Sequence, residues 1–223
     1  MGLNPYQYAF WSPARFIDAN GEFGSEAHVL ITLEVLNPKT ASEWERARRI
    51  ASANVSVDYS DPDSVRDIVA AGEITYRAKQ EGRELTSDEA RAVASLRERV
   101  SERSRQNFLE VIIDYFGVDE EHATGGKVSE ARTRAELLER AARDEYERGN
   151  EAEGDALLGR ATHIRQDIEA HKGISALVHL IEDILPSWII RGPDDPARLL
   201  YPRDYRRAVE ATERSVSSAE EDE

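Results

Sequence analysis

Amphipathic helix patterns, dense in charge, run almost without a break from Asp63 to Leu185. Apolar residues recur there at intervals of three and four, as in the series Val93, Leu96 and Val100. This spacing places them on one face of a helix. A chain with this pattern folds mainly as α-helices, and contacts between those helices supply its core.

The composition indicates long exposed helices and excludes several kinds of chemistry. Hydrophobic residues make up 40% and charged residues 33%, against about 45–50% and about 25% in typical domains. The formal charge of −15 disfavours general binding to nucleic acid. The chain has no cysteine, so disulfides, thiol catalysis, iron–sulfur clusters and zinc–cysteine sites are excluded. No cofactor is predicted.

The first sixty residues have a different pattern. Aromatic residues cluster between positions 6 and 16, Asn20 and Gly21 form a hairpin-turn pair, and apolar residues alternate from Val29 to Val35. Alternation of this kind is typical of a strand. We therefore expect a mainly α fold of helical hairpins or a bundle, with a small N-terminal β-hairpin or sheet as a minor α+β component.

Three regions are predicted along the chain. Residues 1–60 form a small β-containing region with one helix, residues 61–190 a helical body, and residues 191–223 a C-terminal arm with a short helix and an acidic tail. Thr40 with Glu43, and Thr86 with Glu89, have the spacing of capping boxes at helix starts. Gly149 lies where a helix should end.

The sharpest chemical candidate is the series His163, Asp167 and His171, whose members are four residues apart. His179 and Asp183 repeat the spacing further along. Two imidazoles and a carboxylate on one helix face are able to bind a divalent metal. A helical wheel, however, places His163 opposite the apolar stripe of its helix. We therefore interpret these residues as exposed surface pairs, and keep a metal-dependent helical enzyme as the alternative.

Two further features indicate contacts with partners. The segment from Ala90 to Arg105 has five arginines and only two acidic residues, which suits either phosphate or an acidic neighbouring subunit. It lacks the interleaved aromatic residues on which nucleic-acid bases stack. Aromatic and apolar residues near both ends are either core or interface residues. The residues expected at protein interfaces are Trp11, Arg99, Arg103, Trp188, Ile189 and Ile190.

The chain contains no Gly-rich phosphate loop, no G-x-S-x-G elbow and no H-E-x-x-H sequence. The function predicted first is therefore that of a non-enzymatic structural or assembly protein, which self-associates or joins a larger complex. A head, neck or tail component of a virion is one such protein. A nucleic-acid-associated regulator ranks third, behind the metal-dependent enzyme. Without an export signal or a run of about 18 apolar residues, we expect a cytoplasmic or virion location and no membrane.

Overall fold

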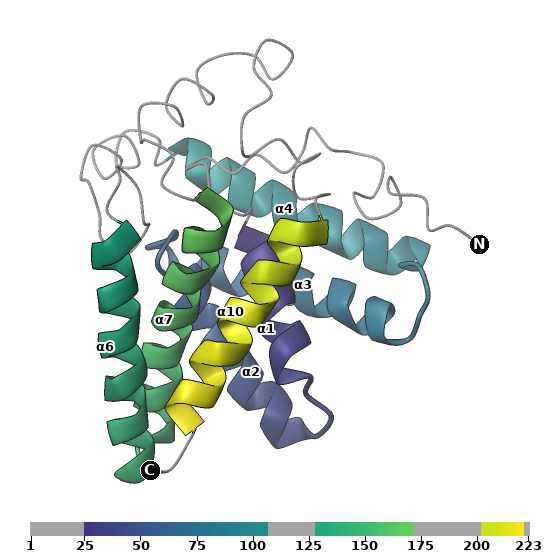
Figure 1. Cartoon of the computed structure of the whole chain (residues 1–223). Coiled ribbons are helices and arrows are strands. Elements are labelled where there is room, and N and C mark those ends of the chain that lie inside the picture. The colour runs from purple at the N-terminus through teal and green to yellow at the C-terminus, as the bar shows by residue number, and fades with distance from the viewer. Residues whose placement is uncertain (1–24, 107–127, 172–201, 221–223) are drawn as a thin grey trace.

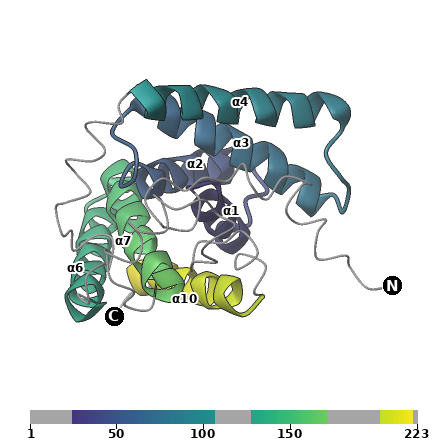
Figure 2. The ribbon, with the colours of Figure 1, turned by 90° about the horizontal axis from the view of Figure 1, so that it is seen from above.

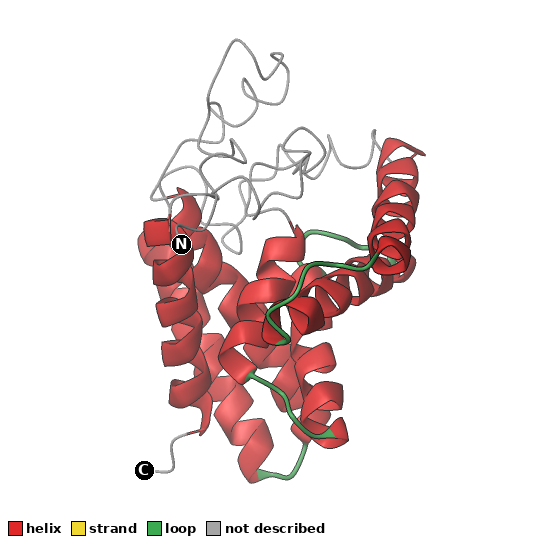
Figure 3. Ribbon diagram, turned by 90° about the vertical axis from the view of Figure 1, so that its right-hand side faces the viewer, coloured by secondary structure: helices red, strands yellow, loops and turns green. Residues whose placement is uncertain are grey.

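The computed structural model describes residues 25–106, 128–171 and 202–220, and all the regular structure in these ranges is helical (Figure 3). This confirms the mainly α fold for the described part of the chain. Its helices are α1 (Ser25–Leu36), α2 (Ala41–Val55), α3 (Pro62–Gln80), α4 (Ser87–Gln106), α6 (Val128–Glu147), α7 (Glu151–His171) and α10 (Pro202–Glu220).

Helix α7 has neighbours on several sides. It packs against α2, α6 and α10, and lies between α6 and α10 in Figure 1. Leu158, Ala161 and Ile164 on α7 are fully buried, and so are Thr162 and His163. Because other helices cover it on more than one face, α7 buries polar as well as apolar residues over most of its length.

A close approach between two helices is made at a glycine of α7. A Cβ atom on Gly159 would lie 2.4 Å from the backbone oxygen of Ile50 and 2.6 Å from the Cβ of Ala53, both on α2. Any side chain here would therefore force the two helices apart. This contact brings the end of α2 against the middle of α7.

The strand predicted over Val29 to Val35 is wrong, because these residues belong to helix α1. Val29, Ile31 and Leu33 are completely buried, and so is Thr32 between them. Helix α1 contacts α2, α3, α7 and α10. A helix that is covered on several sides has apolar residues all round and not in one stripe. The alternation of apolar residues from Val29 to Val35 was therefore mistaken for the pattern of a strand. The hairpin turn predicted before them lies outside the described residues.

Helix α4 runs along α3 on the outer side of the molecule (Figure 2). Val93 and Val100 of α4 are buried, and most of the remaining described residues of the helix are exposed or partly exposed. The narrow apolar stripe read from the sequence is therefore sufficient to dock this helix along one neighbour.

The predicted helix caps are confirmed. The hydroxyl of Thr40 accepts from the backbone N–H of Glu43 at 3.3 Å, and the carboxylate of Glu43 accepts from the N–H of Thr40 at 2.8 Å. Thr86 and Glu89 make the same pair of bonds before α4, at 3.3 and 2.8 Å. Gly149 follows α6 with a φ of 76°, which favours glycine.

Helix α10 is longer than the short C-terminal helix that the sequence predicted, and it extends to Glu220 at the start of the acidic tail. Within the described residues, none of the helices has the length and apolar character needed to cross a membrane. The division of the chain at residues 60 and 190 stays a prediction.

Candidate metal centre

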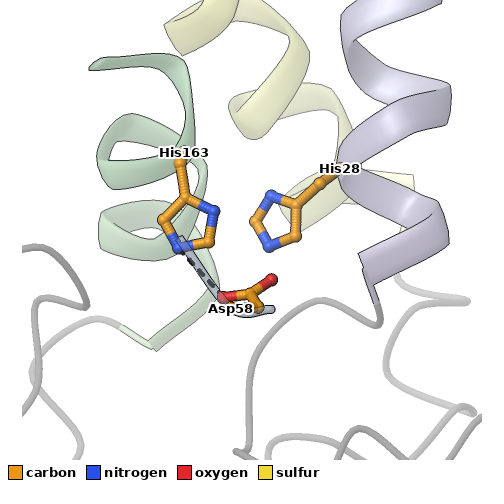
Figure 4. Close-up of side chains that lie close together, drawn as sticks. All are labelled: His28, Asp58 and His163. Atoms are coloured by element: carbon orange, nitrogen blue, oxygen red, sulfur yellow. Dashed lines mark ion pairs between the residues drawn. The ribbon is translucent and has the colours of Figure 1, made fainter. Parts of the chain in front are cut away.

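Two histidines and two aspartates from distant parts of the sequence meet in the interior. His28 is on α1, and His163 and Asp167 are one turn apart on α7. Asp58 lies in the turn after α2, and Figure 4 shows it beside His28 and His163. The side chains of the first three are completely buried, and that of Asp58 is 3% exposed. We refer to these four residues as the His/Asp cluster.

The donor atoms of the cluster converge on one region. One donor atom each from His28, Asp58 and His163 lie within 4.8 Å of one another. The Nε2 atom of His163 is 3.3 Å from Oδ1 of Asp58 and 3.3 Å from Oδ2 of Asp167. The Nε2 atom of His28 is 3.4 Å from Oδ1 of Asp167. Both imidazoles thus present the same ring nitrogen to the carboxylates.

The separation of His163 from Asp58 fits two ligands of one ion better than it fits a hydrogen bond. A charge-assisted bond from an imidazolium to a carboxylate is about 2.7–2.9 Å long, whereas Nε2 of His163 is 3.3 Å from Oδ1 of Asp58. Donor atoms that each lie about 2.1 Å from a tetrahedral ion are about 3.4 Å apart. The distances of 3.3–3.4 Å to Asp167 place that carboxylate against both imidazoles.

A second layer of amide groups contacts the opposite nitrogen of each ring. Nδ1 of His28 is 2.5 Å from the side-chain oxygen of Gln166, and Nδ1 of His163 is 3.1 Å from the side-chain oxygen of Asn54. Metal-binding histidines commonly donate their second N–H to an oxygen in this way, which fixes the orientation of the ring. Both amides are completely buried.

The electrostatics of the cluster favour a neutral imidazole at His28 and a divalent cation. Burial lowers the pKa of His28, and the adjacent His163, whose ring stacks on it with centroids 4.6 Å apart, lowers it further, against the opposing effect of the two aspartates. A neutral imidazole binds metal through its lone pair. Two ionised carboxylates and one divalent cation sum to zero charge, which reduces the cost of burying them.

No protein-family model matches the sequence, and no curated protein or solved structure is significantly similar to it.

The structure brings together two of the five residues proposed as metal ligands from the sequence. His163 and Asp167 share one face of α7, as their spacing predicts. The helical wheel was wrong about that face, however, because both residues are completely buried. The side chain of His171, at the end of α7, lies outside the described part of the chain, as do His179 and Asp183.

The sequence analysis missed His28 and Asp58. Their positions, 28 and 58, are far from 163, so no local spacing connects them. One signal was present: His28 interrupts the apolar series that begins near Ala27, and a polar residue within such a series often serves a buried site. Nothing distinguishes Asp58 from the other acidic residues of its turn.

The arginines proposed for an interface are paired within the chain. Arg99 and Arg103 donate to the carboxylate of Asp67 on α3, at 2.9 and 3.0 Å. Hydrogen bonding by Arg99, followed by Arg103, lowers the pKa of Asp67. Arg97 donates to both carboxylate oxygens of Glu26 at 2.8 Å. These arginines therefore attach α4 to α1 and α3.

The other proposed interface residues lie outside the described ranges. They are Trp11, Trp188, Ile189 and Ile190. Their role at an interface stays a prediction.

Proposed function

We propose that this chain is a metal-dependent helical enzyme of the hydrolytic class. The observation that carries the proposal is the convergence of His28, Asp58 and His163, with donor atoms within 4.8 Å of one another in the interior. Asp167 lies against both imidazoles, with a different oxygen facing each. This function corresponds to the alternative reached from the sequence, with a different ligand set.

The donor atoms indicate the kind of ion. Imidazole nitrogens and carboxylate oxygens suit zinc, iron(II), manganese and related divalent ions. Histidine and carboxylate ligands also occur at catalytic zinc sites, where three protein ligands leave a position for water, whereas structural zinc sites are mostly built from cysteine. We assign His28, Asp58 and His163 as the three ligands, and zinc as the ion used to test them.

Hydrolysis is the chemistry that such a site supports best. A bound divalent ion lowers the pKa of its water to about 7 and so supplies a hydroxide nucleophile. Asp167 lies 3.3–3.4 Å from both histidine ligands, so its carboxylate would be placed to accept a proton from water held there. Asp58 follows α2 in a turn whose neighbouring residues are partly exposed, and we expect substrate to approach from that side.

The first test is binding of Zn²⁺ and Co²⁺ to protein stripped of metal. We expect one ion per chain by calorimetry, and visible Co²⁺ absorption typical of four or five ligands. Asp58→Asn should weaken binding at least tenfold, because a ligand charge is lost. The matched control is Asp155→Asn, a buried carboxylate of α7 that accepts from Arg49 at 2.7 Å and from Tyr146 at 2.9 Å. Wild-type protein that binds neither ion, or an Asp58 variant that binds as the wild type does, contradicts the proposal.

The second test separates metal binding from catalysis. Metal-loaded protein is assayed with bis(p-nitrophenyl) phosphate and p-nitrophenyl acetate as simple phosphodiester and carboxylester substrates. Asp167→Asn should retain the ion and lower kcat by about 10²-fold or more, the usual contribution of a general base. A protein that binds the ion but hydrolyses neither ester contradicts the hydrolytic assignment.

The structural or assembly function stays a prediction. The apolar residues on which it depended lie outside the described ranges, and Arg99 and Arg103 are paired with Asp67. The described part of the chain has one large apolar residue that is strongly exposed, Leu137. No observation on the described residues favours this function over the metal centre.

A further inference from the structure

The two amides next to the His/Asp cluster form a continuous chain of hydrogen bonds with two threonines. We call this chain the amide relay; its members are Thr212, Gln166, Asn54 and Thr162, all completely buried. The relay matters because an imidazole offers the Nε2 lone pair to a metal only when its proton is on Nδ1. The direction of each hydrogen bond in the relay therefore decides whether the histidines are able to bind.

The direction is set at one end by Thr212 on α10. Its hydroxyl donates to the backbone oxygen of Ala208 at 2.8 Å, so towards Gln166 it acts as an acceptor. The amide nitrogen of Gln166 donates to it at 2.9 Å. The amide oxygen of Gln166 consequently faces His28, and Nδ1 of that ring is the donor in the 2.5 Å contact.

Thr162 sets the same direction at the other end. Its hydroxyl donates to the backbone oxygen of Gly159 at 2.8 Å and accepts from the amide nitrogen of Asn54 at 3.2 Å. The amide oxygen of Asn54 therefore faces His163, and Nδ1 of that ring donates to it at 3.1 Å. Both rings thus carry the proton on Nδ1 and present Nε2 to the carboxylates.

Gln166 couples the two ends. Its oxygen accepts from His28 and also from the amide nitrogen of Asn54, at 3.2 Å. If the amide of Gln166 were reversed, its nitrogen would face the nitrogen of Asn54, and two donors would oppose each other. A change at Thr212 therefore reaches His28 through Gln166. Asn54, which orients His163, by contrast also donates to Thr162 and Thr32.

We propose that Thr212, acting through Gln166, is a positioning residue that holds His28 in the tautomer needed to bind metal. Thr212 belongs to a helix that contributes no residue to the His/Asp cluster. The role of Thr212 in metal binding rests on the proposed function. The histidine tautomers are measurable without metal.

The experiment compares Thr212→Val with Thr212→Ser in the full chain. Valine keeps the shape of threonine and removes the acceptor for Gln166, whereas serine keeps the hydroxyl. Histidine tautomers are read from long-range ¹H–¹⁵N NMR spectra of metal-free protein, and zinc affinity from competition with a chelating dye. Thr133→Val is the control, because the hydroxyl of Thr133 makes a similar bond to the backbone four residues earlier, at 3.0 Å, on an exposed face.

We expect Nδ1–H tautomers for His28 and His163 in the wild type, in Thr212→Ser and in Thr133→Val. Thr212→Val should shift His28 towards Nε2–H and weaken zinc binding by about 10–100-fold, the usual effect of losing an outer-shell partner. His163 should stay Nδ1–H, because Thr162 still accepts from Asn54. If that variant does not fold, Gln166→Met removes the oxygen that accepts from Nδ1 of His28 and tests the same shift.

The outcomes separate the relay from the metal centre. A folded Thr212→Val protein with wild-type tautomers overturns the inference, and so does one whose zinc affinity falls while its tautomers stay unchanged. Wild-type protein with Thr212-dependent tautomers that fails to bind zinc overturns the proposed function and leaves the relay standing.

Discussion

At the scale of single residues, Gly159 controls how closely the two sides of the candidate site approach each other. It lies three residues before Thr162 and packs directly on α2, with a virtual Cβ only 3.0 Å from the backbone nitrogen of Asn54. Because Gly159 has no side chain, α7 packs close enough to α2 for the amide of Asn54 to reach His163.

We expect Gly159→Ala to lower the free energy of unfolding by about 1–3 kcal/mol, the usual cost of overpacking. The added methyl group meets backbone atoms of α2, which cannot move aside as a flexible side chain does. Urea unfolding measures the loss, and zinc affinity should fall with it because Asn54 is displaced. Gly82→Ala is the comparison: its φ is 65° but open space surrounds it, so it loses stability without losing zinc affinity. Equal effects of the two variants on zinc affinity would argue against this account.

At the scale of elements, the helix caps show what local sequence is able to predict. A capping box involves residues three positions apart, so Thr40 with Glu43 and Thr86 with Glu89 were recognisable without knowledge of the fold. The two caps nevertheless differ in their surroundings. Arg83 donates to both oxygens of Glu89, at 2.6 and 2.8 Å, and the cap before α2 has no such arginine bond among the described contacts of Glu43.

The cap of α4 should therefore survive unusually low pH. Hydrogen bonds from Arg83, followed by those from Thr86, lower the pKa of Glu89 from 4.5 to about 2. Because the folded pKa lies below the unfolded one, the stabilisation is complete above pH 4.5 and is lost as the pH falls through about 2. Carboxyl ¹³C NMR should show this midpoint, and Arg83→Gln should raise it towards that of Glu43. A Glu89 midpoint unchanged by Arg83→Gln would show that the arginine has no such effect.

The buried helices show where local sequence fails. A hydrophobic stripe marks a helix that has one buried face and one solvent-exposed face, as α4 does. Helices α1 and α7 are covered on several sides, so their polar residues fall on faces that a helical wheel assigns to solvent. This is why the strand over Val29 to Val35 and the exposed position of His163 were both wrong. The candidate site is composed largely of such residues, and the fold class was therefore easier to predict than the site.

At the scale of the whole molecule, the His/Asp cluster joins parts of the chain that have no short connection. His28 comes from α1, Asp58 from the turn between α2 and α3, and His163 from α7. An ion bound by all three stabilises the folded state, because the unfolded chain does not hold the ligands together.

We expect zinc at about one hundred times its Kd to stabilise the fold by about 2.7 kcal/mol. For a domain of this size, that corresponds to a rise in Tm of about 5–10 °C. Calorimetry of metal-free and metal-loaded protein measures the rise, and EDTA should reverse it. Asp58→Asn is the control: with binding weakened at least tenfold, its rise in Tm at the same zinc concentration should be no more than about half as large. A wild-type Tm that is the same with and without zinc would falsify a structural coupling between the ion and the fold.

The distance along the chain between the parts of the site has a consequence for protein synthesis. Gln166 is made 138 residues after His28, the ring that it orients. At about 5–20 residues per second, roughly 7–28 s separate the two on the ribosome. For most of that interval α1 is complete while α7 has not begun and α10 is still to come, so its completely buried face lacks two of its covering helices. Loading of the proposed metal centre is thus a late event for each new molecule, and α1 must escape aggregation until then by other means.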